Sequence, residues 1–165
     1  MIYQSASPDW AVRGASRRET TIQNLGGKLY VTYAVHSKQR GDLPTTGSGF
    51  VNVFDTNGTL LKQLASGHPL KAPWGVAIAP ADFGSFGGAV LVGNFLDGRI
   101  GAYNPATGDF LGRLRDQVGQ PISIEGLFGL TFANGASGGD RGALYFAAGP
   151  GGMQHGLFGS IRFNR

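Results

Sequence analysis

Short apolar runs alternate with glycine-rich polar turns along almost the whole chain. Runs such as Val90-Leu91-Val92 and Leu144-Tyr145-Phe146 are continuously apolar rather than alternating with polar residues. A short apolar run bounded by turn residues is typical of a β-strand whose two faces are both covered. The pattern therefore predicts an all-β fold, with strands near residues 21–25, 28–34, 49–54, 60–65, 74–79, 89–94, 99–103, 109–115, 126–133, 143–148 and 157–163.

The same order of strands and turns recurs along the chain. Residues 49–61 resemble 98–111, and residues 88–95 resemble 142–149. Four short strands repeating every 45–55 residues are the signature of a β-propeller blade. We therefore expect a partial β-propeller of about three antiparallel, nominally four-stranded blades, half of a six-bladed ring. The expected blades are about residues 21–66, 72–116 and 122–165, the last with three strands in this sequence.

Two further expectations follow from this arrangement. Residues 1–20 do not match the repeat, so we expect them to form a poorly ordered tail ahead of a propeller fragment at 21–165. Large aromatic side chains dominate tightly packed cores and are expected to fill the wedges between blades. The aromatic residues assigned to these wedges are Phe54, Trp74, Tyr103, Phe128 and Phe158.

Composition excludes several classes of protein. The chain has 29 glycines among 165 residues and only 15% charged residues, a composition that disfavours long helices. Its net charge of +4 is spread along the sequence, whereas a nucleic-acid binder concentrates basic residues on one face. The absence of cysteine excludes disulfides, cysteine–zinc sites and a thiol nucleophile. No apolar run is long enough for a membrane span, and residues 1–20 lack the pattern of a signal peptide.

Several segments, taken in order, resemble a known group of proteins. They are residues 22–34, 72–77, 93–95, 97–100 and 155–160. Together they resemble an uncharacterised group of exported bacterial proteins similar to NHL-repeat and SMP-30-like six-bladed propellers. The resemblance implies an extracellular or cell-surface location. It also implies that this chain matches only the C-terminal half of such a protein, as a truncated gene product would.

Four polar residues are candidates for ligand binding. Glu125 precedes the expected first strand of the third blade, and the resemblance implies that a carboxylate there could hold a divalent cation. Asn94 and Asp97 follow a strand of the second blade, where they could contact a ligand in the channel or simply stabilise a turn. His155 follows a glycine-rich loop and could face the same end as Glu125. Calcium needs 6–8 oxygen ligands, so Glu125 alone does not define a metal site.

These features favour a non-catalytic binding module over an enzyme. We expect no cofactor, with a divalent cation such as calcium as the alternative. The expected ligand is a protein, a peptide or a carbohydrate, and self-association of two copies would complete the ring. The alternative function is that of an SMP-30-like metal-dependent hydrolase or lactonase with Glu125 as the channel carboxylate. A third possibility is a gene fragment with no independent function.

Overall fold

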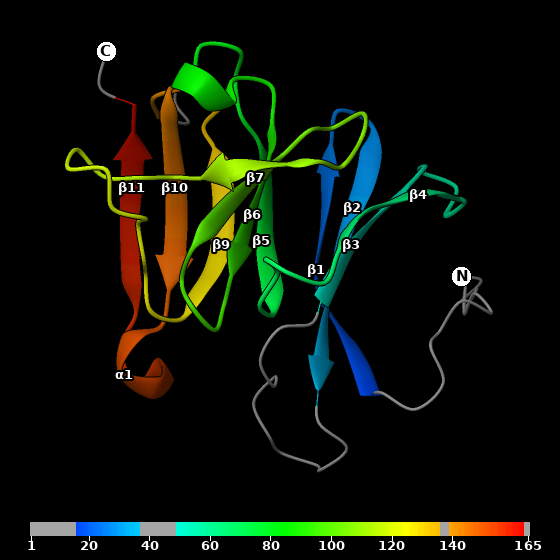
Figure 1. The fold of residues 1–165 in the computed structure, drawn as a ribbon, viewed down its shortest axis with the longest axis horizontal. Helices are drawn as coiled ribbons and strands as arrows, with labels where there is room; N and C mark the ends of the chain where they lie inside the picture. The colour runs from blue at the N-terminus through cyan, green and yellow to red at the C-terminus, as the bar shows by residue number, and fades with distance from the viewer. Residues whose placement is uncertain (1–15, 37–48, 136–138, 164–165) are drawn as a thin grey trace.

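The computed structural model places eleven β-strands in three antiparallel sheets within residues 16–36, 49–135 and 139–163, the parts of the chain that it describes (Figure 1). Sheet 1 has the order β1-β2-β3-β4, sheet 2 the order β5-β6-β7-β8, and sheet 3 the order β9-β10-β11. The strands are β1 (Ser16–Leu25), β2 (Lys28–His36), β3 (Gly49–Phe54), β4 (Leu60–Ser66), β5 (Pro73–Ile78), β6 (Val90–Asn94), β7 (Ile100–Tyr103), β8 (Phe110–Arg113), β9 (Leu127–Phe132), β10 (Ala143–Ala148) and β11 (Leu157–Arg162). A 3-10 turn η1 (Gly84–Phe86) and a short helix α1 (Pro150–Met153) complete the described structure.

The all-β class and the division into three antiparallel sheets are confirmed. The first strand begins earlier than its expected start at residue 21. Strand β1 already begins at Ser16, because residues 16–19 pair with the end of β2, from Ser16 opposite His36 to Glu19 opposite Tyr33. The expected tail therefore includes part of a strand, and its remaining residues, 1–15, lie outside the described residues.

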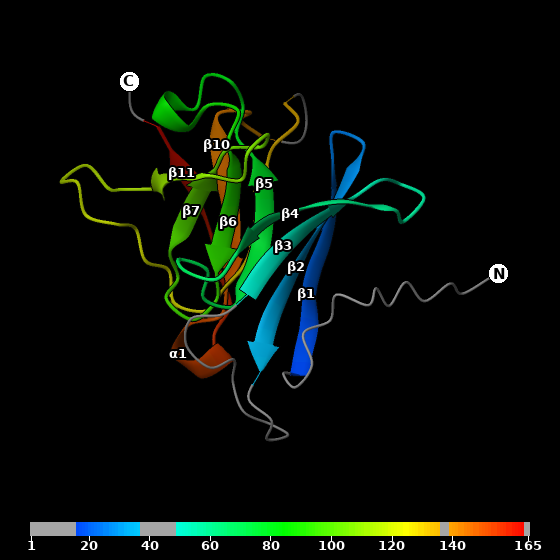
Figure 2. The same ribbon diagram turned by 45° about the vertical axis from the view of Figure 1, so that its right-hand side comes forward.

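The three sheets pack face to face, with sheet 2 in the middle (Figure 2). One apolar core, which includes Val51, Val53 and Val92, joins sheet 1 to sheet 2. A second core, which includes Leu91 and Leu144, joins sheet 2 to sheet 3. Both faces of sheet 2 are thus buried, which explains why the residues of β6 read as one continuous apolar run.

The first strands of the three sheets converge. The Thr32 hydroxyl donates to the Trp74 carbonyl at 2.9 Å, linking sheet 1 to β5. The Gln23 side-chain amide donates to the Leu130 carbonyl of β9 at 3.3 Å. Gly75 of β5 lies against the backbone of β9, since a methyl group at Gly75 would lie 2.7 Å from the Leu130 nitrogen. The close approach of these strands therefore depends on the missing side chain at Gly75.

The aromatic residues divide between the core and the surface. Tyr103 is buried in the core between sheets 1 and 2 as expected. Phe54 is buried but belongs to neither core between the sheets, and Trp74 and Phe128 are half-buried. The expectation for Phe158 is wrong, because 75% of this residue is exposed. Phe158 points away from sheet 2 on the outer face of sheet 3, where its ring stacks on Tyr145 at a centroid distance of 5.9 Å. No sheet in the described part of the chain covers that face.

Candidate functional site

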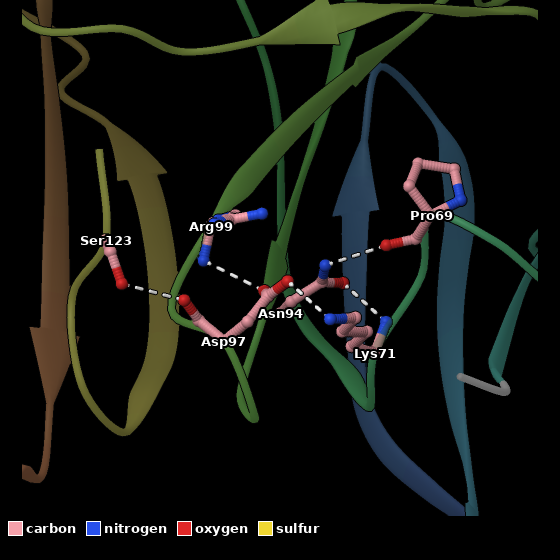
Figure 3. A network of polar contacts seen from close by, with 6 residues as sticks. All are labelled: Pro69, Lys71, Asn94, Asp97, Arg99 and Ser123. Carbon is pink, nitrogen blue, oxygen red and sulfur yellow. Dashed lines mark hydrogen bonds and ion pairs between the residues drawn. The ribbon is translucent and has the colours of Figure 1, made fainter. Parts of the chain in front are cut away.

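Asn94, at the end of β6, fastens the segment that connects sheet 1 to sheet 2. Its side chain is buried and bridges two backbone groups (Figure 3). The side-chain Oδ1 accepts a hydrogen bond from the Lys71 N–H at 3.0 Å, and Nδ2 donates to the Pro69 carbonyl at 3.0 Å. Both amide atoms are therefore engaged by the chain itself, and the side chain acts as a cross-brace rather than as part of its own turn.

Asp97 lies beside this bridge in the turn between β6 and β7. Its Oδ1 accepts a hydrogen bond from the Arg99 N–H at 3.2 Å, and its backbone carbonyl accepts one from the Ser123 hydroxyl at 2.8 Å (Figure 3). Its Oδ2 faces the Lys71 ammonium at 3.5 Å, an ion-pair distance without a well-formed hydrogen bond. Partly exposed pairs of this kind contribute at most about 1 kcal/mol. The network therefore ties together three loops at one end of sheets 2 and 3.

Glu125 stabilises the glycine turn of α1. Its Oε1 accepts hydrogen bonds from the N–H groups of Gly151 at 2.9 Å and Gly152 at 3.4 Å. Both glycines have positive φ angles, 66° and 65°, which aim successive N–H groups at one oxygen. The Glu125 carboxylate thus provides the hydrogen-bond acceptor for the N–H groups of this concave turn. This local structural role accounts for the position of Glu125.

His155 lies at the other side of the same turn. A methyl group added at Gly151 would lie 3.2 Å from the His155 Cδ2. Glu125 accepts a hydrogen bond from Gly151 and the His155 ring lies near the same glycine, so both residues lie at one end of sheet 3. Asn94 and Asp97 form a separate network with Pro69, Lys71 and Arg99.

Within the described residues, no three side chains of the His, Asp and Glu types lie close enough together to bind a metal ion. The same residues contain no helix with the length and apolarity needed to cross a membrane. The polar candidates therefore stabilise loops instead of converging on one centre.

Three aromatic rings form a cluster at the same end of the molecule as the Asn94 network. Trp74 lies 5.2 Å from Phe128 and 5.4 Å from Phe95, measured between ring centroids. Phe95 and Phe128 are 5.4 Å apart. All three residues are half-buried. Since Phe95 follows Asn94 directly, the polar network and the cluster of aromatic rings hold the same turn in place.

Two pKa values are shifted by local structure. Hydrogen bonds from backbone N–H groups, that of Thr59 foremost, lower the pKa of Asp55 in the β3–β4 turn. This turn, which includes Asn57 and Gly58, connects β3 and β4 as a hairpin. Burial raises the pKa of Tyr103 well above its usual value of about 10. Because deprotonated Tyr103 is disfavoured in the core, its contribution to stability declines as the pH rises above about 10.

Sequence reasoning missed Asn52, the most unusual polar residue of the structure. Asn52 lies in the middle of β3 and is completely buried. Neither amide atom has a hydrogen-bond partner within the described residues. It pairs across the strands with Val31, on the face of sheet 1 opposite the core that contains Val51 and Val53. The only sequence signal is a polar residue inside the apolar run of β3.

Replacing Asn52 by leucine is expected to stabilise the isolated chain by about 1–3 kcal/mol. Leucine has a similar shape, and a buried amide without partners costs that much free energy. The matched control is Thr32→Val, since Thr32 is also completely buried but bonded to Trp74. That substitution should destabilise by about 1–2 kcal/mol. Urea unfolding followed by tryptophan fluorescence measures both, and a destabilised Asn52→Leu variant would contradict the prediction.

The outer face of sheet 3 is the other feature that the polar motifs did not indicate. Thr131 and Ala147 are exposed there beside the stacked Tyr145 and Phe158 rings. In sheet 2, 54 residues earlier in the sequence, Ala77 and Leu91 occupy the places equivalent to Thr131 and Tyr145, and there they are buried against sheet 3. The uncovered face of sheet 3 thus repeats a face that sheet 2 buries.

Sequence comparison places this chain beside three uncharacterised proteins of Acanthamoeba polyphaga mimivirus. One is 37% identical over 113 residues, which cover 67% of this chain and 28% of the relative. A second is 33% identical over 115 residues, covering 68% and 22%. A third is 33% identical over 146 residues, covering 86% and 37%. The chain thus spans between about a fifth and somewhat more than a third of the length of these curated relatives.

No family model and no solved structure matches the chain. The expected membership in a bacterial exported group similar to NHL-repeat and SMP-30-like propellers is therefore wrong, since the relatives found are viral. The segments that suggested it are strands and turns, whose residue types follow from β-sheet geometry. An extracellular location was implied by that resemblance alone and stays an untested prediction.

Proposed function

We propose that the chain is a non-catalytic interaction module, a three-bladed part of a β-propeller whose ring is completed by a second copy. The observation that carries the proposal is the uncovered outer face of sheet 3, which has the residue pattern of a face built for burial. Each of the three sheets then serves as one blade, and two copies supply six, within the usual range of 4–8.

The repeat supports the position of a further sheet. Gly75 makes room for the backbone of β9, and Gly129 stands at the equivalent position of β9. A methyl group at Gly129 would meet only Ala147, with its Cβ 3.6 Å away. Gly129 thus leaves the space that an additional inner strand needs, on a face with no sheet over it in the described residues.

The opposite end of the stack offers a second face. Ile22 is 60% exposed on the outer side of β1, whereas Val31 and Asn52 in the same cross-strand row are buried. A pair of copies related by a two-fold axis would set sheet 3 of each copy against sheet 1 of the other. The outer face of sheet 3 and the exposed part of sheet 1 at Ile22 would be covered at once.

The roles of the polar residues favour binding over catalysis. Both side-chain amide atoms of Asn94 form hydrogen bonds with the segment 69–71, and one carboxylate oxygen of Glu125 accepts a hydrogen bond from the α1 turn. A metal-dependent hydrolase, the alternative, needs several oxygen ligands converging on the ion. Glu125 is exposed and accepts hydrogen bonds from two backbone N–H groups of the α1 turn, so the arrangement offers no comparable support for hydrolysis.

The mass in solution tests the proposal. Size-exclusion chromatography with light scattering is expected to give twice the chain mass of 17.3 kDa for the unmodified protein. Phe158→Glu should give the monomer mass, because it places a charge in the proposed contact. The matched control, Val118→Glu, changes an even more exposed apolar residue, 79% accessible, in a loop away from that face and should leave the pair intact. A monomeric unmodified protein, or a Phe158→Glu variant that still pairs, would refute the proposal.

A further inference from the structure

Within the described residues, sheet 3 ends at β11, where the other two sheets have a fourth strand. In sheets 1 and 2 the third strand turns directly into a fourth, β4 or β8, that pairs with it. In sheet 3 the outermost described strand is β11, which pairs with β10 on one side only. An edge strand of this kind carries a row of backbone donors and acceptors that can pair with another chain.

The outward-facing groups of that edge can be assigned from the register. The Gly149 N–H donates toward β9, to the Gly126 carbonyl at 2.9 Å. Backbone groups alternate between the two sides of a strand, so Leu144 and Phe146 face β11. Their partners in β11 are Ile161 and Gly159. By the same alternation, Ser160 directs its N–H and carbonyl to the open side.

A groove accompanies this edge at the place where a fourth strand would lie. It consists of two adjoining hollows of about 610 and 500 Å³ between the outer strands of sheets 2 and 3. Leu111 and Gly112 of β8 line one wall, and Ile161 and Phe163 line the other. Leu111 and Phe163 are 49% and 52% exposed. The groove therefore combines unpaired strand edge with uncovered apolar side chains.

The packing of β4 shows what an outer strand does in this fold. Leu64 of β4 is buried in the core between sheets 1 and 2, and its carbonyl lies against Gly108 in the turn between β7 and β8. Lys62 donates to the carbonyls of Pro105 and Ala106 in the same turn. The outer strand of sheet 1 thus packs on the outer part of sheet 2, and the groove beside β8 is the place where an outer strand of sheet 3 would pack on sheet 2.

The charged side chains that line the groove indicate which kind of segment it would bind. Arg113, Arg115 and Arg162 line the groove, whereas its one acidic lining residue is Asp116. The Asp116 Oδ1 already accepts hydrogen bonds from two backbone N–H groups of its own loop. Arg162 also faces Asp140 at 3.4 Å, but both side chains are more than half exposed and such a pair is weak. The groove therefore favours an extended segment that presents both apolar and acidic side chains on its groove-facing side.

We propose that the open edge of β11 binds an extended acidic peptide segment of a partner protein, which pairs antiparallel with β11 as the fourth strand of sheet 3. Main-chain hydrogen bonds to Ser160 and its alternate neighbours hold the peptide, as in other complexes formed by strand addition. Apolar side chains of the peptide enter the groove beside Leu111 and Phe163, and its carboxylates lie near Arg113 and Arg115. This edge is distinct from the outer face used in the proposed pairing of two copies.

Fluorescence anisotropy with two capped, labelled nine-residue peptides tests this inference. In both peptides the alternate residues that face the groove are valines and charged residues, and the charged residues are glutamate in one peptide and lysine in the other. The glutamate peptide should bind the unmodified protein at least about tenfold more tightly than the lysine peptide. The double variant Arg113→Glu, Arg115→Glu should reverse this preference. Absence of binding by the glutamate peptide, or equal binding of both peptides, would overturn the proposal.

A proline at Ser160 tests the pairing itself. Ser160→Pro removes the outward N–H while leaving the pairing with β10, and proline is tolerated at such edge positions. It should weaken the glutamate peptide at least about tenfold, whereas Ser160→Ala should bind as the unmodified protein does. Unchanged binding by Ser160→Pro would overturn strand addition. Light scattering on the same samples separates the two proposals. If Ser160→Pro abolishes the dimer of two copies, the β11 edge binds a second copy instead of a peptide. If only Phe158→Glu abolishes the dimer, the outer face of sheet 3 forms the dimer contact and the edge does not.

Discussion

Gly75→Ala should destabilise the protein by about 3 kcal/mol, because the added methyl group would collide with the backbone of the neighbouring sheet. The added carbon would lie 2.7 Å from the Leu130 nitrogen and 2.8 Å from the Phe128 carbonyl oxygen. Both are backbone atoms of β9, so relief requires sheets 2 and 3 to separate at their inner strands. Urea unfolding monitored by tryptophan fluorescence measures the loss, and Trp74 reports directly on this contact.

Gly129→Ala is the matched control, since the repeat places Gly129 at the equivalent position of the next sheet. Its added methyl would make only an ordinary contact, 3.6 Å from the Ala147 Cβ. The change in stability should therefore stay within about 0.5 kcal/mol. A similar loss for both variants would mean that the inner strands of sheets 2 and 3 do not approach as closely as the structure shows. A bulkier residue at Gly129 tests pairing instead, because it would fill the space proposed for a further strand.

Asn94→Ala should cost about 3 kcal/mol. The substitution leaves the Lys71 N–H and the Pro69 carbonyl without their partner in a buried place, and each such group costs about 1–3 kcal/mol. The loss should appear as a lower urea midpoint with an unchanged slope. Because the bridge ties sheet 1 to sheet 2, the connecting segment should also become more sensitive to proteolysis.

The control for Asn94 is Asn104, an asparagine that stabilises an exposed turn. Its Oδ1 accepts hydrogen bonds from the N–H groups of Ala106 at 2.8 Å and Thr107 at 3.2 Å. Water can replace these bonds, so Asn104→Ala should cost about 1 kcal/mol or less. If Asn94→Ala lowered the free energy of unfolding no more than Asn104→Ala does, the Asn94 bridge between the sheets would contribute no more to stability than an exposed turn.

The polar residues show where sequence reasoning reached its limit. The types and turn positions of Asn94, Asp97 and Glu125 are visible in the sequence, but their partners lie 23–26 residues away along the chain. Only the packing of loops from different sheets brings these groups together. Asn52 is the opposite case, because its lack of a partner depends on every neighbour that the fold places around it.

The sequence by itself determined the strands, their order and their grouping into three antiparallel sheets. Those features rest on local physics: apolar runs of strand length, tight turns such as Asn57-Gly58, and pairing between consecutive strands. Tertiary structure alone decided which apolar faces are covered. Phe158 and the buried residues of sheet 2 follow the same sequence pattern, but a neighbouring sheet packs on one and not on the other. Burial depends on which sheets pack against a strand in space, and the sequence of one repeat does not show whether a neighbouring sheet packs on it.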